Sequence, residues 1–270
     1  MLYIFLLICS LSAQENKEVQ FSTTNYRPKV PSYEQLAPER INFFSILTGP
    51  KIKNLENLDQ SEGDSLNQWN QVSFQWKMTK DTYFVANPRF VMTYNPEDNR
   101  SFDWDNPVFG VVTKWYESGN FRFAGGVNSI IPLLRTESTK EDGLIFNPGG
   151  FNDLNYRISY NWEIGTWLWA RLLFYNRSTN NENNRVSYFA APRIKYTFSD
   201  NFNTMIFYQI NGVANSNYKF IIENEDSLNL MLSYQINSRL TLEPILTLLE
   251  EDNFNTKSMQ LNLWISMRIL

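Results

Sequence analysis

Short segments in which apolar and polar residues alternate recur along this chain. The last segment is the most regular, because every second position is apolar: Met259, Leu261, Leu263, Ile265, Met267 and Ile269. The positions between them hold Gln260, Asn262, Trp264, Ser266 and Arg268. A period of two residues predicts a β-strand with one apolar face and one polar face.

The gaps between these segments switch regularly between tight turns and long connections. Tight turns are expected near residues 80, 118, 165, 200 and 237, and long connections at 55–65, 95–106, 135–153, 176–185, 212–226 and 250–257. Bacterial transmembrane barrels have short periplasmic turns, longer outer loops and an even number of strands. The pattern therefore predicts an all-β fold, a transmembrane antiparallel up-and-down β-barrel of about 12 strands over residues 41–270, with both termini on the periplasmic side.

Aromatic residues make up 16 % of the chain and gather near the tight turns. Amphipathic rings at the headgroup level form such belts in membrane proteins. The expected belt contains Trp76, Phe84, Trp115, Phe121, Tyr160, Trp162, Trp167, Tyr196, Phe198, Phe202 and Tyr234. A soluble β-sandwich or a lipocalin-like barrel is the competing fold, but the repeated strands and the nearly uncharged apolar face favour a membrane barrel.

The N-terminal residues 1–13 suit the apolar region of a signal peptide, because the run is too short to span a bilayer. Residues 14–40 are polar, carry three prolines and show no clean periodicity. We expect a periplasmic N-terminal extension there, with a segment folded into the barrel mouth as the alternative. Cys9 is the only cysteine and would leave with the signal, which excludes thiol chemistry in the mature protein.

The composition also bears on catalysis and on partners. The chain has no histidine, so neither the Ser–His–Asn phospholipase site nor the omptin-type His–Asp protease site of outer-membrane barrels can be built. The usual zinc ligands are missing for the same reason, and we expect no metal and no cofactor. A net charge of −4 gives no basic field for nucleic acid. The chain is therefore not expected to be an enzyme.

Basic residues share the parity opposite to the apolar face, so we expect them to line the lumen. They are Lys77, Arg89, Lys114, Arg122, Arg157, Arg171, Arg193, Lys195 and Arg268, with Glu243 as the clear acidic residue among polar neighbours such as Asn128, Gln209 and Gln260. A positive, wet lumen lowers the electrostatic barrier for anions. The best candidates for one continuous basic wall are Arg157, Arg171, Arg193 and Lys195.

A structural reading of the same residues stays open. These basic side chains could pair with inward-folded loop carboxylates or fill the interior without conducting, because charges in a narrow lumen need partners. Strand periodicity does not decide whether a loop or the N-terminal segment plugs the tube, nor does it identify a solute or an oligomeric state.

Taken together, strand number, turn alternation and aromatic placement over residues 41–270 resemble the bacterial outer-membrane β-barrels, and among them the twelve-stranded channels and porins. Those include acidic-oligosaccharide porins and nucleoside channels. The resemblance implies a Gram-negative outer-membrane protein with lipid, lipopolysaccharide and the barrel-assembly machinery as partners. It further implies passive diffusion of small polar, anionic solutes as the function. A structural or adhesive surface barrel without transport activity is the alternative.

Overall fold

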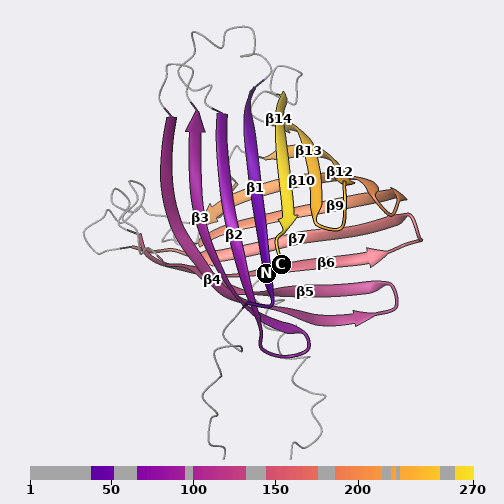
Figure 1. The fold of residues 1–270 in the computed structure, drawn as a ribbon, viewed down its shortest axis with the longest axis horizontal. Coiled ribbons are helices and arrows are strands. Elements are labelled where there is room, and N and C mark those ends of the chain that lie inside the picture. Colours follow the sequence, from indigo (N-terminus) through magenta and orange to yellow (C-terminus); the bar gives the residue numbers. More distant parts are fainter. Residues whose placement is uncertain are drawn as a thin grey trace, which may run out of the picture. The chain divides into compact units, whose positions relative to one another are not determined.

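The fold is described from a computed structural model, which covers residues 38–51, 66–94, 100–131, 144–175, 186–214, 220–222, 226–249 and 259–270. Every regular element in these ranges is a β-strand (Figure 1). No helix among the described residues is long and apolar enough to cross a membrane. The expected signal peptide, and the expected extension as far as residue 37, lie outside the described residues.

The described residues form twelve long strands and two short ones. The long strands are β1 (Arg40–Lys51), β2 (Leu66–Lys77), β3 (Thr82–Tyr94), β4 (Arg100–Ser118), β5 (Phe121–Ile130), β6 (Leu144–Arg157), β7 (Trp162–Leu172), β9 (Val186–Ser199), β10 (Phe202–Ala214), β12 (Ser227–Gln235), β13 (Leu240–Leu249) and β14 (Met259–Arg268). The short strands are β8 (Phe174–Tyr175), which pairs with β6, and β11 (Phe220–Ile222), which pairs with β10.

The long strands close into one antiparallel barrel. Each pairs with the long strands before and after it in the chain, and β14 pairs with β1, so that Phe43 lies opposite Met267 and Leu47 opposite Leu263. Figure 1 shows β14 beside β1 at this closure. The all-β, twelve-stranded, up-and-down barrel expected from the sequence is therefore confirmed. β1 begins and β14 ends at the same end of the barrel as the tight turns.

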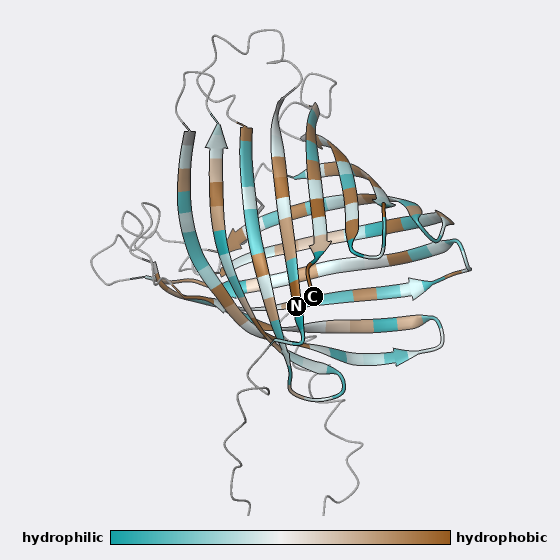
Figure 2. Ribbon diagram, viewed as in Figure 1, coloured by the Kyte–Doolittle hydropathy of each residue, from teal (hydrophilic) through white to brown (hydrophobic). Residues whose placement is uncertain are grey.

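Exposure alternates along the strands and separates an outer face from an inner one. On β12, Leu230 has 41 % of its surface exposed whereas its neighbour Met231 has 5 %. The same alternation of hydrophobic and hydrophilic positions is visible along many strands in Figure 2. Since successive side chains of a strand point to opposite faces, the exposed apolar row faces outward and the other row faces the interior.

One expected turn is wrong. The chain reverses between β6 and β7 at Ile158–Asn161, where the backbone N–H groups of Ile158 and Ser159 both donate to the carbonyl of Trp162 at 2.9 and 3.3 Å. The sequence pointed to residues 163–166 instead, because apolar residues continue at even positions through the turn and Gly165 looks like a turn former. Gly165 lies inside β7, opposite Asn155.

Three expected long connections are too wide, and the one expected at 212–226 includes the end of β10 and all of β11. β4 begins at Arg100, so residues 100–106 extend a strand instead of the connection expected at 95–106. β6 begins at Leu144, so Leu144–Asp153 is strand instead of part of the connection expected at 135–153. Asp, Asn, Gly and Pro concentrate in the stretches at the starts of β4 and β6, and these residues favour turns in general. On a barrel wall, however, every second position faces the interior and tolerates them.

Aromatic rings contact one another in two outward bands. Near the tight turns, Trp162 and Tyr196 have ring centroids 4.7 Å apart, and Trp76 and Phe84 5.7 Å. Towards the opposite end of the strands, Phe90 contacts Phe102 at 5.3 Å and Trp104 at 5.9 Å, and Phe146 contacts Phe174 at 6.1 Å. Two bands flanking an apolar stretch match the interfacial girdles of membrane barrels.

The outward face of β12 provides a test of the lipid-facing surface. Leu230→Arg places a charge near the middle of a strand, and we expect it to lower the free energy of unfolding by about 2–4 kcal/mol. The control Ile236→Arg, in the β12–β13 turn, should cost less than about 1 kcal/mol, because a charge near the interface stays hydrated. Denaturant titration of the protein folded into lipid vesicles measures both. Equal costs would show that this face does not meet hydrocarbon.

Candidate functional site

The first interior cluster surrounds the guanidinium of Arg193 on β9. Its Nη2 atom donates to Asp153 Oδ1 and, at 2.6 Å, to Asn155 Oδ1, both on β6. The other oxygen of Asp153 pairs with Arg122 of β5 at 3.3 Å. The guanidinium also lies 4.0 Å from the ring centroid of Trp167. Arg193 is 5 % exposed and Asp153 27 %, so this is a largely buried, neutralised pair that links β6 to β9 across β7.

Gly165 makes this arrangement sterically allowed. It lies on β7 directly between Asn155 and Arg193 in the strand register. A Cβ atom on Gly165 would meet Asn155 Oδ1 at 2.7 Å and Arg193 Nε at 3.4 Å. The missing side chain therefore leaves the space in which Arg193 crosses β7 to reach Asp153. Close approach of neighbouring groups, not a turn, is the reason for glycine at this position.

Two further interior arginines are Arg89 of β3 and Arg171 of β7. Arg89 Nη2 is 2.9 Å from Asp105 Oδ2, Arg89 Nε donates to the Asn106 carbonyl at 2.7 Å, and its guanidinium lies 5.8 Å from the Trp69 ring centroid. The guanidinium of Arg171 lies 5.7 Å from the Trp169 ring centroid.

Arg171 differs from Arg193 in what surrounds it. The buried Nη1 atoms of both arginines have no hydrogen-bond partner among the described residues. Unlike Arg193, however, Arg171 forms no ion pair with a described carboxylate. Its stem lies over Gly149 of β6, where a Cβ atom would meet Arg171 Cγ at 2.5 Å. Arg171 is therefore a partly buried, inward-facing base without a described carboxylate in ion-pair distance, as is Lys195.

The interior also has an apolar wall. A buried cluster of Ala191, Met205, Phe207, Met231 and Ile245 lies on the inward faces of β9, β10, β12 and β13, with Trp167, Phe189 and Trp264 packed against it. Rings extend this wall: Trp169 and Phe189 stack at 5.8 Å with planes 6° apart, and Phe44 contacts Trp264 edge-on at 5.6 Å.

Two sequence-based expectations are corrected by this wall. The interior is not uniformly polar, because apolar side chains occupy part of the inward face. Alternation predicts which residues point inward, but it does not predict that all of them are polar. Trp167, expected in the outer aromatic belt, faces inward and contacts Phe207 at 5.6 Å and Arg193 at 4.0 Å. Its placement in the belt followed from the misplaced turn near residue 165.

The remaining predicted basic residues lie on the same inward parity but close to the tight turns. Lys114 is 2.6 Å from Glu117 and 3.7 Å from Asp81, and all three are exposed. Lys77, Arg157 and Arg268 are exposed near strand ends. Lys195 lies opposite Glu163, which in turn lies opposite Arg157.

The four residues expected to form one basic wall are divided. Arg193 lies opposite Gly165, six positions from Arg171 on β7, which corresponds to about 20 Å along a strand. Arg157, Lys195 and Arg193 therefore belong to the tight-turn end, and Arg171 belongs to the other end with Arg89. That these groups line a conducting lumen stays a prediction.

The carboxylates that pair with the arginines were missed at the sequence level. Asp105 and Asp153 lie in stretches for which the sequence predicts loops, and Glu243 is the clear acidic residue that strand parity predicts for the inner face. The structure adds Asp103, Asp105, Asp153 and Glu163 to that face. Alternation with Phe102 and Trp104 is the signal that could have extended β4 to Asp103 and Asp105.

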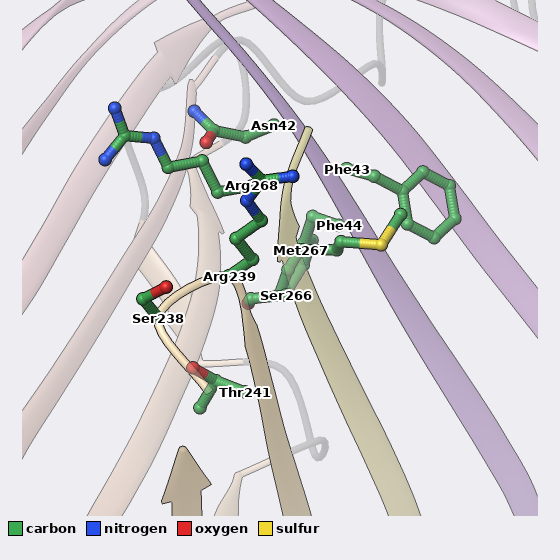
Figure 3. A pocket seen from close by; sticks show the side chains of 9 residues that line it. All are labelled: Asn42, Phe43, Phe44, Ser238, Arg239, Thr241, Ser266, Met267 and Arg268. Atoms are coloured by element: carbon green, nitrogen blue, oxygen red, sulfur yellow. The ribbon is translucent and has the colours of Figure 1, made fainter. Parts of the chain in front are cut away.

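A pocket of about 340 Å³ lies where β1, β13 and β14 meet the tight-turn end. Arg239 and Arg268 lie beside each other in it, near Asn42 (Figure 3). Neither arginine makes an ion pair with a described carboxylate, but both are exposed to water. Arg239 belongs to a turn, where strand parity gives no information.

Within the described ranges, no group of three or more His, Cys, Asp or Glu residues could hold a metal ion. No family model and no curated protein matches the sequence. The fold, in contrast, matches solved structures: the COG4313 outer membrane channel from Pseudomonas putida F1, with a TM-score of 0.55, 10 % identity and coverage of 93 % of this chain and 100 % of that one. The NanC porin matches with a TM-score of 0.50, 8 % identity and coverage of 84 % and 97 %. This chain has the fold of the outer-membrane β-barrel channels. At such low identity, the likeness concerns the barrel and none of its side chains.

The buried Arg193–Asp153 pair gives a test of the barrel's interior. Asp153→Asn leaves a buried guanidinium without its countercharge, and we expect the free energy of unfolding to fall by about 3 kcal/mol. Glu117→Gln is the matched control, because it removes one carboxylate from the exposed pair with Lys114 and should leave stability unchanged. Unfolding in denaturant measures both variants. An Asp153→Asn protein as stable as the parent would show that contacts other than Asp153 stabilise the buried guanidinium of Arg193.

Proposed function

We propose that this protein is a channel of the Gram-negative outer membrane through which small polar solutes diffuse passively, with anions preferred. The observation that supports it best is the excess of basic over acidic side chains on the inward face, which includes Arg171 without a described carboxylate partner. A fixed positive charge in a narrow aqueous tube lowers the electrostatic barrier for anions. The fold shared with outer-membrane channels supports the transport role.

The outward face supports the proposed location. Two aromatic bands flank an apolar stretch on the strands, which suits contact with lipid and lipopolysaccharide, and such a barrel would need the barrel-assembly machinery to insert. On this proposal the tight turns and both termini face the periplasm, and the long connections face the exterior.

A structural or adhesive surface barrel is the second candidate. The paired Arg193 and the apolar cluster around Met231 and Phe207 favour it, because both occupy interior space and stabilise the barrel without any need for conduction. The two candidates differ in one measurable property, which is the passage of ions.

The purified protein in planar bilayers should give discrete conductance steps, and the reversal potential under a salt gradient should show anion preference. The Debye length is about 10 Å at 0.1 M salt and about 3 Å at 1 M, so high salt should reduce the preference. Absence of conductance steps would favour the structural or adhesive barrel. A preference for cations would contradict the role of the basic residues in selectivity.

A double variant tests the source of the selectivity. Arg157→Gln with Lys195→Gln removes two inward charges that form no ion pair among the described residues, and we expect the anion-to-cation permeability ratio to move towards unity. Lys80→Gln, in the exposed β2–β3 turn, removes a charge outside the strands and should leave the ratio near that of the parent. Identical ratios in all three proteins would place the selectivity elsewhere.

A further inference from the structure

The pocket where β1, β13 and β14 meet differs in charge from its surroundings. Among the described residues that line it, Arg239 and Arg268 are the charged ones, and no carboxylate is present. Lys114 and Arg122, which also lie near the tight turns, each form an ion pair with a carboxylate. The pocket therefore carries two positive charges without a countercharge among the described residues.

Backbone hydrogen bonds fix the two arginines beside each other. The N–H of Arg268, at the end of β14, donates to the carbonyl of Arg239 at 2.7 Å. Arg239 lies in the β12–β13 turn, where Asn237 Oδ1 accepts from the N–H groups of Arg239 and Leu240 at 2.8 and 3.0 Å. An Asn side chain that bonds the backbone two residues on stabilises a turn. The backbone of both arginines is therefore held in place before any ligand binds.

The two guanidinium groups lie on the inner side of the sheet. Asn42 lies opposite Arg268 in the register of β1 and β14, so both residues share the inward parity. Figure 3 shows Arg239 and Arg268 extending to the same side as Asn42, whereas Phe43 and Met267 point the opposite way. A ligand that contacts both guanidiniums therefore approaches from inside the barrel and not from the outer face.

Most hydrogen-bond donors of the two guanidiniums are available to such a ligand. The side chain of Arg239 forms no hydrogen bond with a described residue. In Arg268, Nε donates to the carbonyl of Leu270 at 3.3 Å, and its Nη atoms form no hydrogen bond with a described residue. Hydrogen bonds from a guanidinium to an anionic oxygen are roughly twice as strong as those between neutral groups. An anion with several oxygens can accept such bonds from both arginines.

Charge and size together indicate the class of anion. Two guanidiniums side by side repel each other, and a dianion offsets this repulsion better than a single carboxylate does. A phosphate monoester carries a charge of about −1.5 to −2 at pH 7 and three acceptor oxygens, and the paired donors of arginine match phosphate geometry. The pocket volume of about 340 Å³ lies within the range of about 300–1,000 Å³ typical of small-molecule pockets. It therefore leaves room for an organic part beside the phosphate.

We propose that Arg239 and Arg268 form a binding site for small, water-soluble phosphate monoesters at the tight-turn end of the barrel interior. The phosphate lies between the two guanidiniums, and the organic part lies towards the polar side chains of Asn42, Thr241 and Ser266, which line the same pocket. Binding itself does not depend on conduction. A role of the site in the passage of solutes rests on the proposed channel function.

Equilibrium dialysis of radiolabelled glycerol 3-phosphate against the folded barrel, in an uncharged detergent without phosphate, tests the site. We expect saturable binding that Arg239→Gln and Arg268→Gln each weaken about tenfold or more, because one charge-assisted contact is lost. Arg239→Lys should lie between the parent and Arg239→Gln, because it keeps the charge and loses the paired donors. Lys80→Gln removes a charge from the exposed β2–β3 turn at the same end. It is the matched control and should bind like the parent.

Competition and pH identify the chemistry of the ligand. Inorganic phosphate should displace glycerol 3-phosphate, whereas acetate at equal concentration should displace little of it, because acetate brings one charge. Lowering the pH from about 7.5 to about 5.5 should weaken binding several-fold, because the phosphate takes up a proton near its second pKa of about 6. The two arginines stay protonated over this range, and the chain has no histidine.

Two results would contradict the proposal. Equal binding of glycerol 3-phosphate by the parent, Arg239→Gln and Arg268→Gln would show that these arginines do not hold the phosphate. Tighter binding of a short-chain phosphatidylglycerol than of glycerol 3-phosphate would assign the site to a lipid headgroup instead. Heat-modifiable gel mobility verifies that each variant is folded.

Conductance of the parent keeps this site and the channel proposal apart. Ion conduction without binding of glycerol 3-phosphate removes the site and leaves the channel. Binding that depends on Arg239 and Arg268, without conduction, removes the channel and leaves a binding site at one end of the barrel.

Discussion

Closure of the sheet through β1 and β14 is the constraint on which the rest of this structure depends. Hydrocarbon offers no partner to a backbone N–H or C=O group, so a sheet can cross a membrane only without free edges. The register from Asn42–Arg268 to Thr48–Asn262 supplies that last row of hydrogen bonds. Beyond it, the carbonyl of Ile41 accepts from the N–H groups of Ile269 and Leu270 at 2.8 and 3.2 Å. Once the ring is closed, each strand has one outward face and one face towards the interior.

Closure of the barrel also explains why some interior arginines have a carboxylate partner and others do not. Side chains at the same height on neighbouring strands are brought together whatever their separation in sequence, and Arg193 meets Asp153 although 40 residues separate them. Glycine at Gly165 and Gly149 lets each arginine cross a neighbouring strand. Arg193 thereby reaches the carboxylate of Asp153, whereas Arg171 forms no ion pair with a described carboxylate.

An apolar wall beside these charges divides the interior into two kinds of surface. Met205, Phe207, Met231 and Ile245 stabilise the β9–β13 side as a soluble core would. The charged groups lie largely on the strands from β3 to β9. The interior therefore has an apolar wall beside a charged one.

The sequence by itself determined the strand type, the twelve long strands, the closing β14 and most tight turns, because a period of two residues and turn-forming residues are local properties. It also determined which parity carries the basic residues. It failed where Tyr156, Ile158, Tyr160 and Trp162 continue one parity through a turn, and where Asp105 and Asp153 lie in strands that resemble loops. Only the tertiary structure decided which arginine is paired, because pairing depends on the register of strands distant in sequence. The tertiary structure also decided that Trp167 points inward, because the position of a turn fixes which residues of the following strand point into the barrel.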